Sequence, residues 1–412
     1  MKFPDSKSQV RILLFTKAFY PMVGGIETVT ETMAELFNKL GYDCEVLTTI
    51  ENPEPDIFSY KVHRKPGFLK TIKLIRNADL VVSKGASLAL VPYCVLVGKP
   101  FVWIHSGYQA SCVDGLGWVD GEPAPMTPRA SLEFHYKRSG LLFTVVAAFK
   151  LFIRRFACKH IVKMNVAVSD WVAMRQPFDK QIRIHNPFPI YRFGEEARAR
   201  SRAAYQFVYL GRLVSEKGVG TLIRAFGLVR KQNPGTPLKL LIIGEGNWRS
   251  HLVDLTEALS LEDHVVFAGR KTGQELIDLL QQGEIAVVPS EWEEPMGGVA
   301  LELLAAGKPV IVSKNGGLAE CVGDAALLFD NGDHVMLADC MTRLLNDQKL
   351  RATLLENAKA QVKKFDPERL IRRYIDLFAY VLGESKELKS ADPSANAPGR
   401  EAEFKLSTMN ER

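Results

Sequence analysis

Two glutamates with seven residues between them mark the segment of this chain that is best suited to chemistry. Glu294 and Glu302 lie in EEPMGGVALELLAAGKPVIV, directly after the apolar run IAVVPS. The pattern predicts a buried strand, a glycine turn and a helix start, where backbone N–H groups can point at an anion. Glu294 can face the polar part of a ligand, and Glu302 can accept hydrogen bonds from a sugar diol. The alternative is a surface loop with Glu302 solvated on its helix.

Two cations follow another predicted strand. Arg212 and Lys217 lie in GRLVSEKG, after QFVYL. Both can close on one diphosphate, the arginine through its planar fork and the lysine as a point charge. Two solvated surface cations are the alternative, but the position after a buried strand favours ligand binding.

The N-terminal half offers two further candidates at strand ends. Gly24 and Gly25 lie between the first predicted strand and helix, where glycine lets the backbone approach a ligand closely. They do not form the GxGxxG pattern, which disfavours an NAD oxidoreductase. His105 ends the strand FVWIH, and its place at the cleft-facing end favours function over a structural role.

These candidates need a scaffold, and strand patterns alternate with helical patterns in two series. The predicted strands are RILLFT, CEVLTT, DLVVSKG, PFVWIHSG, NVAVSD and QIRIHNPF, then QFVYLGRL, LKLLIIGEG, HVVFAGR, IAVVPS and KPVIVSK. Such alternation predicts an α/β protein with two Rossmann-like doubly wound domains facing across a cleft, where ligands bind beyond the carboxyl ends of the strands.

The domain boundaries follow from composition. We expect an N-terminal domain over 1–190, a polar linker over 191–205 and a C-terminal domain over 206–383, whose last helix has the option of packing back on the N-terminal domain. The polar residues 384–412 are expected to be disordered.

Composition excludes several classes of protein. The chain has 412 residues, with 53 Lys and Arg against 47 Asp and Glu, so no nucleic-acid partner is expected. Six scattered cysteines without a CxxC pair favour reduced thiols over disulfides or zinc. The N-terminus lacks an apolar signal core, and no run is long enough to span a membrane. We expect a cytoplasmic location, with the inner face of the membrane as an alternative.

Taken together, the motifs resemble those of a known family. GGIE, the strand-end His, GRLVSEKG, GEG and PSEWEEPMGGVALELLAAGKPVI occur in the order found in retaining glycosyltransferases of the GT-B fold, the large group-4 (glycosyl transferases group 1) family. The resemblance is strongest over 207–345, good over 11–50 and thin over 106–205.

The resemblance implies a transfer from a nucleotide-diphosphate sugar, used as substrate and not as cofactor. Arg212 and Lys217 would bind the donor diphosphate, Glu294 would hold the transferring sugar, and His105 would contact that sugar near the reacting centre. In this family the acceptor attacks from the leaving-group face and the phosphate takes its proton, so no glycosidase-like carboxylate pair is needed. The absence of a D-x-D element predicts that no metal is required.

Further donor contacts are also implied by the resemblance. Glu302 would bind the ribose hydroxyls and Arg270 would lie near the base. The remaining implied contacts are Gly24, Gly25, Gly244, Met296, Gly297, Gly298 and Val299, the last of which would open the helix facing the phosphate. The family usually has Phe in place of Met296, and it has Asn-Gly-Val-Asp where this chain has HNPFP, so the stretch around Asn186 receives no role.

Two segments concern the acceptor. Residues 106–140 show little periodicity, which predicts a long functional loop with Asp114, Trp118 and Asp120 as acceptor-binding candidates. The stretch 134–169 contains no Asp or Glu. On a helical wheel, Lys150, Arg154, Arg155 and Lys159 spread over one half, and Phe149, Phe152, Ile153 and Phe156 cluster on the other. Such a helix can dock on an anionic membrane, and an ordinary domain helix with a solvated basic face is the alternative.

The predicted function is therefore a retaining, metal-independent glycosyltransferase acting on a hydroxyl of a glycan or lipid-linked acceptor. A soluble small-molecule glycosyltransferase is the alternative. A non-catalytic nucleotide-sugar-binding protein is disfavoured because Arg212, Lys217 and Glu294 are all present.

Overall fold

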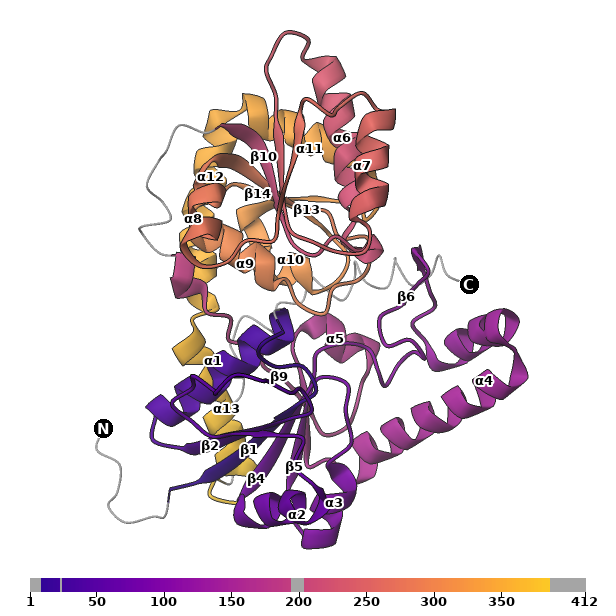
Figure 1. Cartoon of the computed structure of the whole chain (residues 1–412), viewed down its shortest axis with the longest axis vertical. Helices are drawn as coiled ribbons and strands as arrows, with labels where there is room; N and C mark the ends of the chain where they lie inside the picture. Colours follow the sequence, from indigo (N-terminus) through magenta and orange to yellow (C-terminus); the bar gives the residue numbers. More distant parts are fainter. Residues whose placement is uncertain (1–8, 23, 194–203, 386–412) are drawn as a thin grey trace.

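Two α/β domains form the molecule, each built around one parallel sheet (Figure 1). The computed structural model describes residues 9–22, 24–193 and 204–385. The N-terminal sheet has seven strands in the order β3-β2-β1-β4-β5-β8-β9. These strands are β1 (Arg11–Thr16), β2 (Asp43–Thr48), β3 (Val62–Arg64), β4 (Leu80–Lys84), β5 (Phe101–His105), β8 (Met164–Ala167) and β9 (Gln181–Arg183).

The C-terminal sheet has six strands in the order β12-β11-β10-β13-β14-β15. They are β10 (Tyr205–Leu210), β11 (Leu240–Ile243), β12 (Val265–Gly269), β13 (Gly283–Val288), β14 (Val310–Ser313) and β15 (Ala326–Phe329). Pairing is parallel throughout both sheets, so the predicted fold class is confirmed. The prediction missed β3 and β15, two short edge strands of three and four residues.

Helices cover both faces of each sheet. In the N-terminal domain they are α1 (Gly25–Lys39), α2 (Phe68–Asn77), α3 (Val91–Val97), α4 (Pro128–His160) and α5 (Asp170–Arg175). In the C-terminal domain they are α6 (Val219–Gln232), α7 (Arg249–Ala258), α8 (Gly273–Gln281), α9 (Gly298–Ala305), α10 (Gly317–Val322), α11 (His334–Asn346) and α12 (Gln348–Lys364). Burial on both faces explains continuous apolar strands such as β1, where Leu14 and Phe15 join different core clusters.

The last helix, α13 (Pro367–Val381), packs on the N-terminal domain beside α1. The rings of Phe37 and Phe378 lie 5.4 Å apart, and the Tyr374 hydroxyl donates to the Ile184 carbonyl at 3.3 Å. Together with the crossing near residue 190, this helix ties the two domains at two points of the chain.

The connections differ in part from the sequence-based expectation. Residues 106–140 are not one long loop, because α4 begins at Pro128 and a two-stranded hairpin, β6 (Trp118–Val119) and β7 (Glu122–Pro123), precedes it. Proline suits the first turn of a helix. The two parts of α4 meet at Gly140, whose φ of 80° only glycine adopts readily. Most of the predicted linker (194–203) and tail (386–412) lies outside the described residues.

Candidate donor-binding and catalytic site

A partly buried ion pair lies at the centre of the predicted site. Glu294, in the loop between β13 and α9, is 7% exposed. Its Oε1 accepts a hydrogen bond from Lys217 Nζ at 2.7 Å and another from the Ser290 hydroxyl. Backbone pairing with the loop after β14 fixes the Glu294 segment, because Gly317 N–H donates to the Glu294 carbonyl at 2.6 Å. The structure thus brings two predicted catalytic residues together.

The loop that carries Lys217 is held by close backbone contact. Gly218 directly precedes α6 and has a φ of 65°, and a Cβ at this position would lie 1.9 Å from the Pro289 carbonyl oxygen. Lys217 Nζ also lies 5.6 Å from the centre of the Trp292 ring, in a cation–π contact. Arg212, by contrast, has a side chain 62% exposed, 3.5 Å from Glu216. One predicted cation is therefore fixed, and the other remains open to solvent.

The GEG turn lies against this loop. A Cβ at Gly244 would lie 1.8 Å from the Gly211 carbonyl oxygen, and one at Gly246 would lie 2.1 Å from the Leu213 carbonyl oxygen. Glycine is thus required for the packing of the turns after β10 and β11. The predicted contact of Gly244 with the donor stays a prediction.

The start of α9 meets the other domain at the ring of Phe188. A Cβ on Gly298 would lie 2.2 Å from this ring, and a Cβ on Gly25 would lie 3.8 Å from it. Gly25, the first residue of α1, therefore shares one neighbour with Gly298 at the start of α9. Predicted donor-binding positions from both domains thus converge.

Two details of this turn differ from expectation. The N–H of Gly297 donates to Cys321 Sγ at 3.2 Å, so it is not directed at a sugar in this structure. Helix α9 begins at Gly298, one residue before the predicted Val299. Met296 is buried, and its sulfur accepts a hydrogen bond from the Asn186 N–H at 3.2 Å.

Glu302 lies on α9 and is partly buried. Burial raises the pKa of Glu302 to about 7, and the nearby charge of Arg192 acts in the opposite direction. The carboxyl therefore changes charge close to neutral pH. Arg270 follows β12 and is exposed, which leaves it accessible to a nucleotide base.

His105 does not contact the cleft, contrary to prediction. Its side chain is fully buried between the rings of Trp103 and Phe178, and its Nε2 lies 2.9 Å from Asn165 Oδ1. Burial lowers the pKa of His105 to about 4, so the ring is neutral at pH 7. Alternation along β5 explains the error, because His105 shares its face with the core residue Trp103.

The three acceptor candidates make contacts within the protein. Asp114 Oδ1 accepts hydrogen bonds from three successive amides, at Leu116, Gly117 and Trp118. The Trp118 indole donates to the Ser215 hydroxyl at 2.9 Å, and Asp120 pairs with Arg138. The β6–β7 hairpin therefore reaches across to the loop that carries Lys217. Contact of these residues with an acceptor stays a prediction.

Sequence reasoning missed a buried lysine at the end of β4. Lys84 is 1% exposed, and its Nζ lies 2.5 Å from Asn186 Oδ1 and 3.5 Å from Ser106 Oγ. Within the described residues, no carboxylate lies within 4.0 Å of it. Burial lowers the pKa of Lys84 to about 7. A lysine that ends an apolar strand, as in DLVVSK, was the available signal.

Sequence reasoning also gave no role to Glu293, the neighbour of Glu294. Arg175 contacts its carboxylate with two nitrogens, at 2.9 and 2.5 Å, and the Trp171 indole donates to it at 2.7 Å. The Tyr108 hydroxyl donates to its carbonyl at 2.9 Å. Helix α5 of the N-terminal domain thus holds the loop that carries Glu294.

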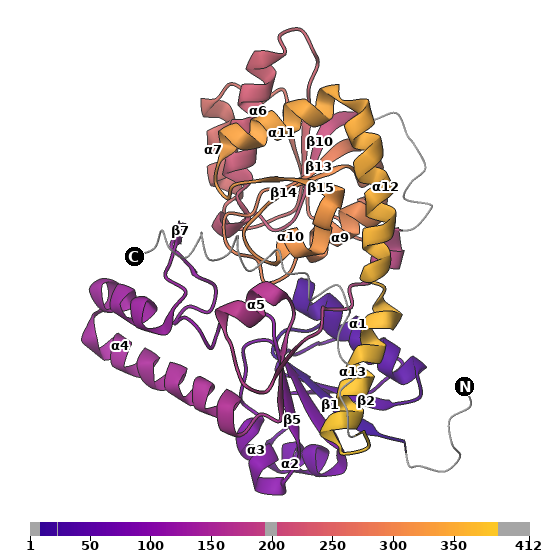
Figure 2. The same cartoon turned by 180° about the vertical axis from the view of Figure 1, so that it is seen from behind.

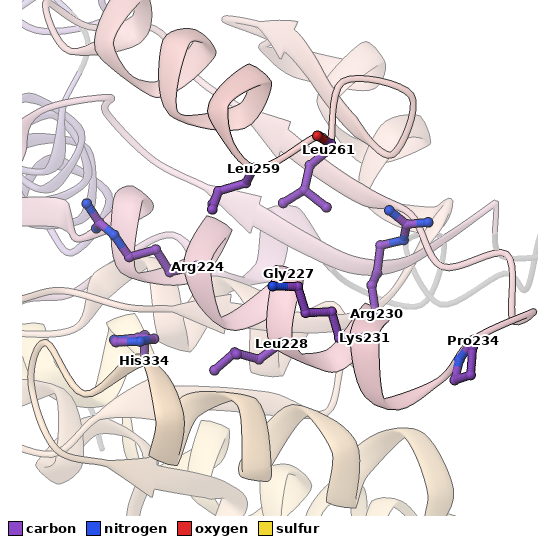
Figure 3. A pocket seen from close by; sticks show the side chains of 10 residues that line it. Arg224, Gly227, Leu228, Arg230, Lys231, Pro234, Leu259, Leu261 and His334 are labelled. Carbon is purple, nitrogen blue, oxygen red and sulfur yellow. The ribbon is translucent and has the colours of Figure 1, made fainter.

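A separate cavity lies elsewhere in the C-terminal domain (Figure 3). Its volume is about 560 Å³, and it lies between α6, the end of α7 and the start of α11. Four of its lining residues are basic, namely Arg224, Arg230, Lys231 and His334. None of the predicted site residues lines it.

Comparison with known proteins shows which proteins this sequence and fold are similar to. Residues 195–361 match the family model described as Glycosyl transferases group 1. The sucrose-phosphate synthase of Thermosynechococcus elongatus has a similar fold, with a TM-score of 0.69 and 20% identity over 92% of this chain and 100% of that one. HepE of Anabaena, solved with UDP, gives a TM-score of 0.68 and 18% identity over 90% of this chain and 100% of that one.

Sequence relatives agree with this class. The D-inositol 3-phosphate glycosyltransferase of Salinispora tropica is 31% identical over 47% of this chain and 44% of its own length. The glycogen synthase of Mycobacterium tuberculosis is 36% identical over 40% of this chain and 39% of its own length. The matched region thus spans less than half of either relative. The resemblance seen in the sequence is confirmed: residues 195–361 match the group 1 glycosyltransferase model, and the two domains have the fold of GT-B glycosyltransferase structures.

Proposed function

We propose that the protein is a retaining glycosyltransferase that moves a sugar from a nucleotide-diphosphate sugar to a hydroxyl of a glycan or lipid-linked acceptor. The observation that carries this proposal is the partly buried Lys217–Glu294 pair, set between the end of β10 and the start of α9. HepE of Anabaena has been solved in complex with UDP and with UDP-glucose, which supports a nucleotide-sugar donor.

The proposed reaction breaks the bond between the anomeric carbon and the diphosphate oxygen. The acceptor oxygen bonds to that carbon from the same face, and its proton passes to the departing phosphate. Negative charge grows on the leaving group, where Arg212, Lys217 and the N-terminus of α9 stabilise it. Donor binding would exchange the Lys217–Glu294 contact for contacts of each residue with the donor.

The proposal includes metal independence, because two cations and a helix start supply positive charge at the diphosphate. Among the described residues there is no group of three or more His, Cys, Asp or Glu side chains arranged to hold a metal ion. The direct check is turnover in EDTA. Loss of turnover in EDTA, with rescue by Mg²⁺ or Mn²⁺, would overturn this part.

The acceptor has two candidates, each favoured by one observation. The exposed apolar side chains of α4 favour a lipid-linked acceptor at a membrane surface on the cytoplasmic side. The relative named as a D-inositol 3-phosphate glycosyltransferase favours a small soluble acceptor.

A donor screen tests the proposed function. The protein is incubated in EDTA with UDP-, GDP-, ADP- and dTDP-sugars, and release of the nucleoside diphosphate is measured. At least one donor should be hydrolysed slowly without acceptor. Calorimetric binding of a donor without turnover, either alone or with acceptor extracts, would instead support a non-catalytic nucleotide-sugar-binding protein.

A further inference from the structure

Helix α4 extends away from the body of the N-terminal domain, as Figures 1 and 2 show from opposite sides. Its longer part, residues 141–160, exposes an unusual number of large apolar side chains. These are Leu141, Leu142, Phe143, Val145, Val146, Phe149, Phe152, Ile153 and Phe156, with exposures from 44% to 81%. A single exposed apolar residue is common, but a contiguous set of this kind marks an interaction surface.

The orientation of α4 differs from that of an ordinary domain helix, in which the basic face would be solvated and the apolar face buried. The side that meets the body is lined by small or aliphatic residues, including Ala147, Leu151 and Cys158, which are buried. Arg154 donates to the Gln109 carbonyl at 3.2 Å and Arg155 to the Ala110 carbonyl at 2.9 Å. Two of the four basic residues thus attach the helix to the domain, and the phenylalanines face outward.

The outward residues form one continuous surface, which we call the apolar face. Leu142, Val145, Phe149, Phe152 and Phe156 follow one another at intervals of three or four residues. This spacing places them on a single side of a helix. None of the described helices is both long and apolar enough to cross a bilayer, so the surface suits a contact parallel to a membrane.

Charge decides between a bilayer and a second copy of the chain as the occupant. Residues 134–169 contain no acidic side chain, and Lys150 and Lys159 are exposed beside the apolar face. A two-fold contact would place this surface against itself, lysines included. An anionic bilayer offers apolar chains to the phenylalanines and negative headgroups to the lysines.

We propose that the apolar face of α4 inserts into the interfacial region of an anionic bilayer. The segment between β5 and α4 includes the β6–β7 hairpin, whose Trp118 contacts Ser215 in the donor loop. Insertion of α4 would therefore bring the border of the donor site close to the membrane. The link to a lipid-linked acceptor rests on the proposed function, whereas the docking itself does not.

Vesicle flotation tests the docking. The wild-type protein is mixed with phosphatidylglycerol–phosphatidylcholine vesicles and compared with the triple variant F149S/F152S/F156S. The matched control is I57S/L69S/L96S, which removes three other side chains that are 78%, 79% and 68% exposed. Vesicle affinity should fall at least about tenfold in the α4 variant, because each buried Phe contributes strongly, and should be unchanged in the control.

The outcomes separate docking from the alternatives. K150Q/K159Q should weaken binding at low salt, and vesicles of phosphatidylcholine alone should bind less protein than anionic ones. Equal binding of wild type and the α4 variant would overturn the proposal. So would a wild-type dimer in size-exclusion chromatography that the α4 variant abolishes while no vesicle binding is seen. Thermal unfolding verifies that each variant is folded.

Donor hydrolysis in solution distinguishes this proposal from the proposed function. Hydrolysis should be the same in the wild type and the α4 variant, because α4 lies outside the donor site. Vesicle binding without hydrolysis of any donor would leave docking standing and overturn the transferase. Donor hydrolysis without vesicle binding would support the transferase and overturn docking.

Discussion

The residue that carries most of the proposed chemistry is Glu294, and its partner in the structure is a cation. The partly buried Lys217 and the buried Ser290 both contact its Oε1. The Ser290 contact can persist when donor binding exchanges the Lys217 contact, and a polar group held in place in this way is effective because little rearrangement accompanies the reaction. Glu302 lies one to two turns into α9, where the nearby charge of Arg192 lowers its pKa less than burial raises it.

The two glutamates should differ in kinetic signature. Glu294→Ala should lower kcat by roughly 10²–10³-fold, because it removes a contact at the reacting sugar. Glu302→Ala should mainly raise the donor KM, since ribose contacts are similar in the ground and transition states. Steady-state kinetics with the best donor measures both. Near-normal kinetics in both folded variants would show that the site is assigned wrongly.

Lys84 leads to a prediction about stability and pH. Its folded pKa is about 7 against an ordinary value of 10.5, so the folded protein binds the proton less readily than the unfolded chain does. The penalty of the buried charge is fully present below pH 7 and fades as the pH rises toward 10.5. At each pH, the free energy of unfolding of Lys84→Met can be compared with that of the wild type. This difference, variant minus wild type, should be about 3 kcal/mol larger at pH 7 than at pH 9.5.

Urea unfolding of both proteins at the two pH values provides the measurement. Lys84→Gln serves as a polar control and should show the same pH trend, because it also removes the titrating amine. If the difference in free energy of unfolding between variant and wild type does not change with pH, Lys84 is not buried as described.

At the scale of elements, α5 and the loop before α9 act as one unit across the domain boundary. Arg175 and Trp171 bind the carboxylate of Glu293, which directly precedes Glu294. Nearby, His185 contacts Glu320 of α10 at 2.6 Å, and the Asp170 N–H donates to the same carboxylate at 2.8 Å. Both contacts join the N-terminal domain, after β9 and at the start of α5, to helix α10 of the C-terminal domain.

A double-mutant cycle tests this unit. Arg175→Met and Glu293→Gln should each reduce kcat/KM, and the double variant should be little worse than either, because both remove one interaction. The expected coupling is about 1–3 kcal/mol in transition-state stabilisation. Additive losses would mean that α5 does not position Glu294. Arg138→Met, which breaks an exposed pair with Asp120, is the control and should not couple with Glu293→Gln.

Some of the strands and helices could be predicted from the sequence, and others could not. Strands such as β1 and β14 are continuous apolar runs because both of their faces are buried, so they are easy to recognise. The short edge strands β3 and β15 carry no such signal. Residues 128–139 form a helix although their apolar periodicity is weak. The periodicity is weak because only a few side chains of this segment, such as Ser131 and His135, are buried.

The same contrast holds for the site. The residues of GRLVSEKG and EEPMGG were found because they lie next to recognisable strands, and the structure places Lys217 and Glu294 in contact. His105 was misplaced because a strand-end position does not reveal which face a side chain takes. Glu293 and Lys84 were missed because their partners come from distant segments, around Arg175 and Asn186.

For the whole molecule, the two sheets present the carboxyl ends of their strands toward a shared boundary, and α13 crosses it to pack on α1 (Figure 1). The loops that carry Lys217 and Glu294, the glycine turn before α1 and the hairpin before α4 all meet there. The account therefore predicts that donor and acceptor are bound from opposite sides of this boundary, with α4 outside it.

The central claim is a retaining transfer at Glu294, and the configuration of the released sugar tests it most directly. The protein is incubated in EDTA with its best donor, an α-linked nucleotide sugar, and proton NMR records the anomer of the first sugar released, before mutarotation. The account predicts the α-anomer, with release lost in Glu294→Ala. The β-anomer as first product, or equal release by Glu294→Ala, would contradict it.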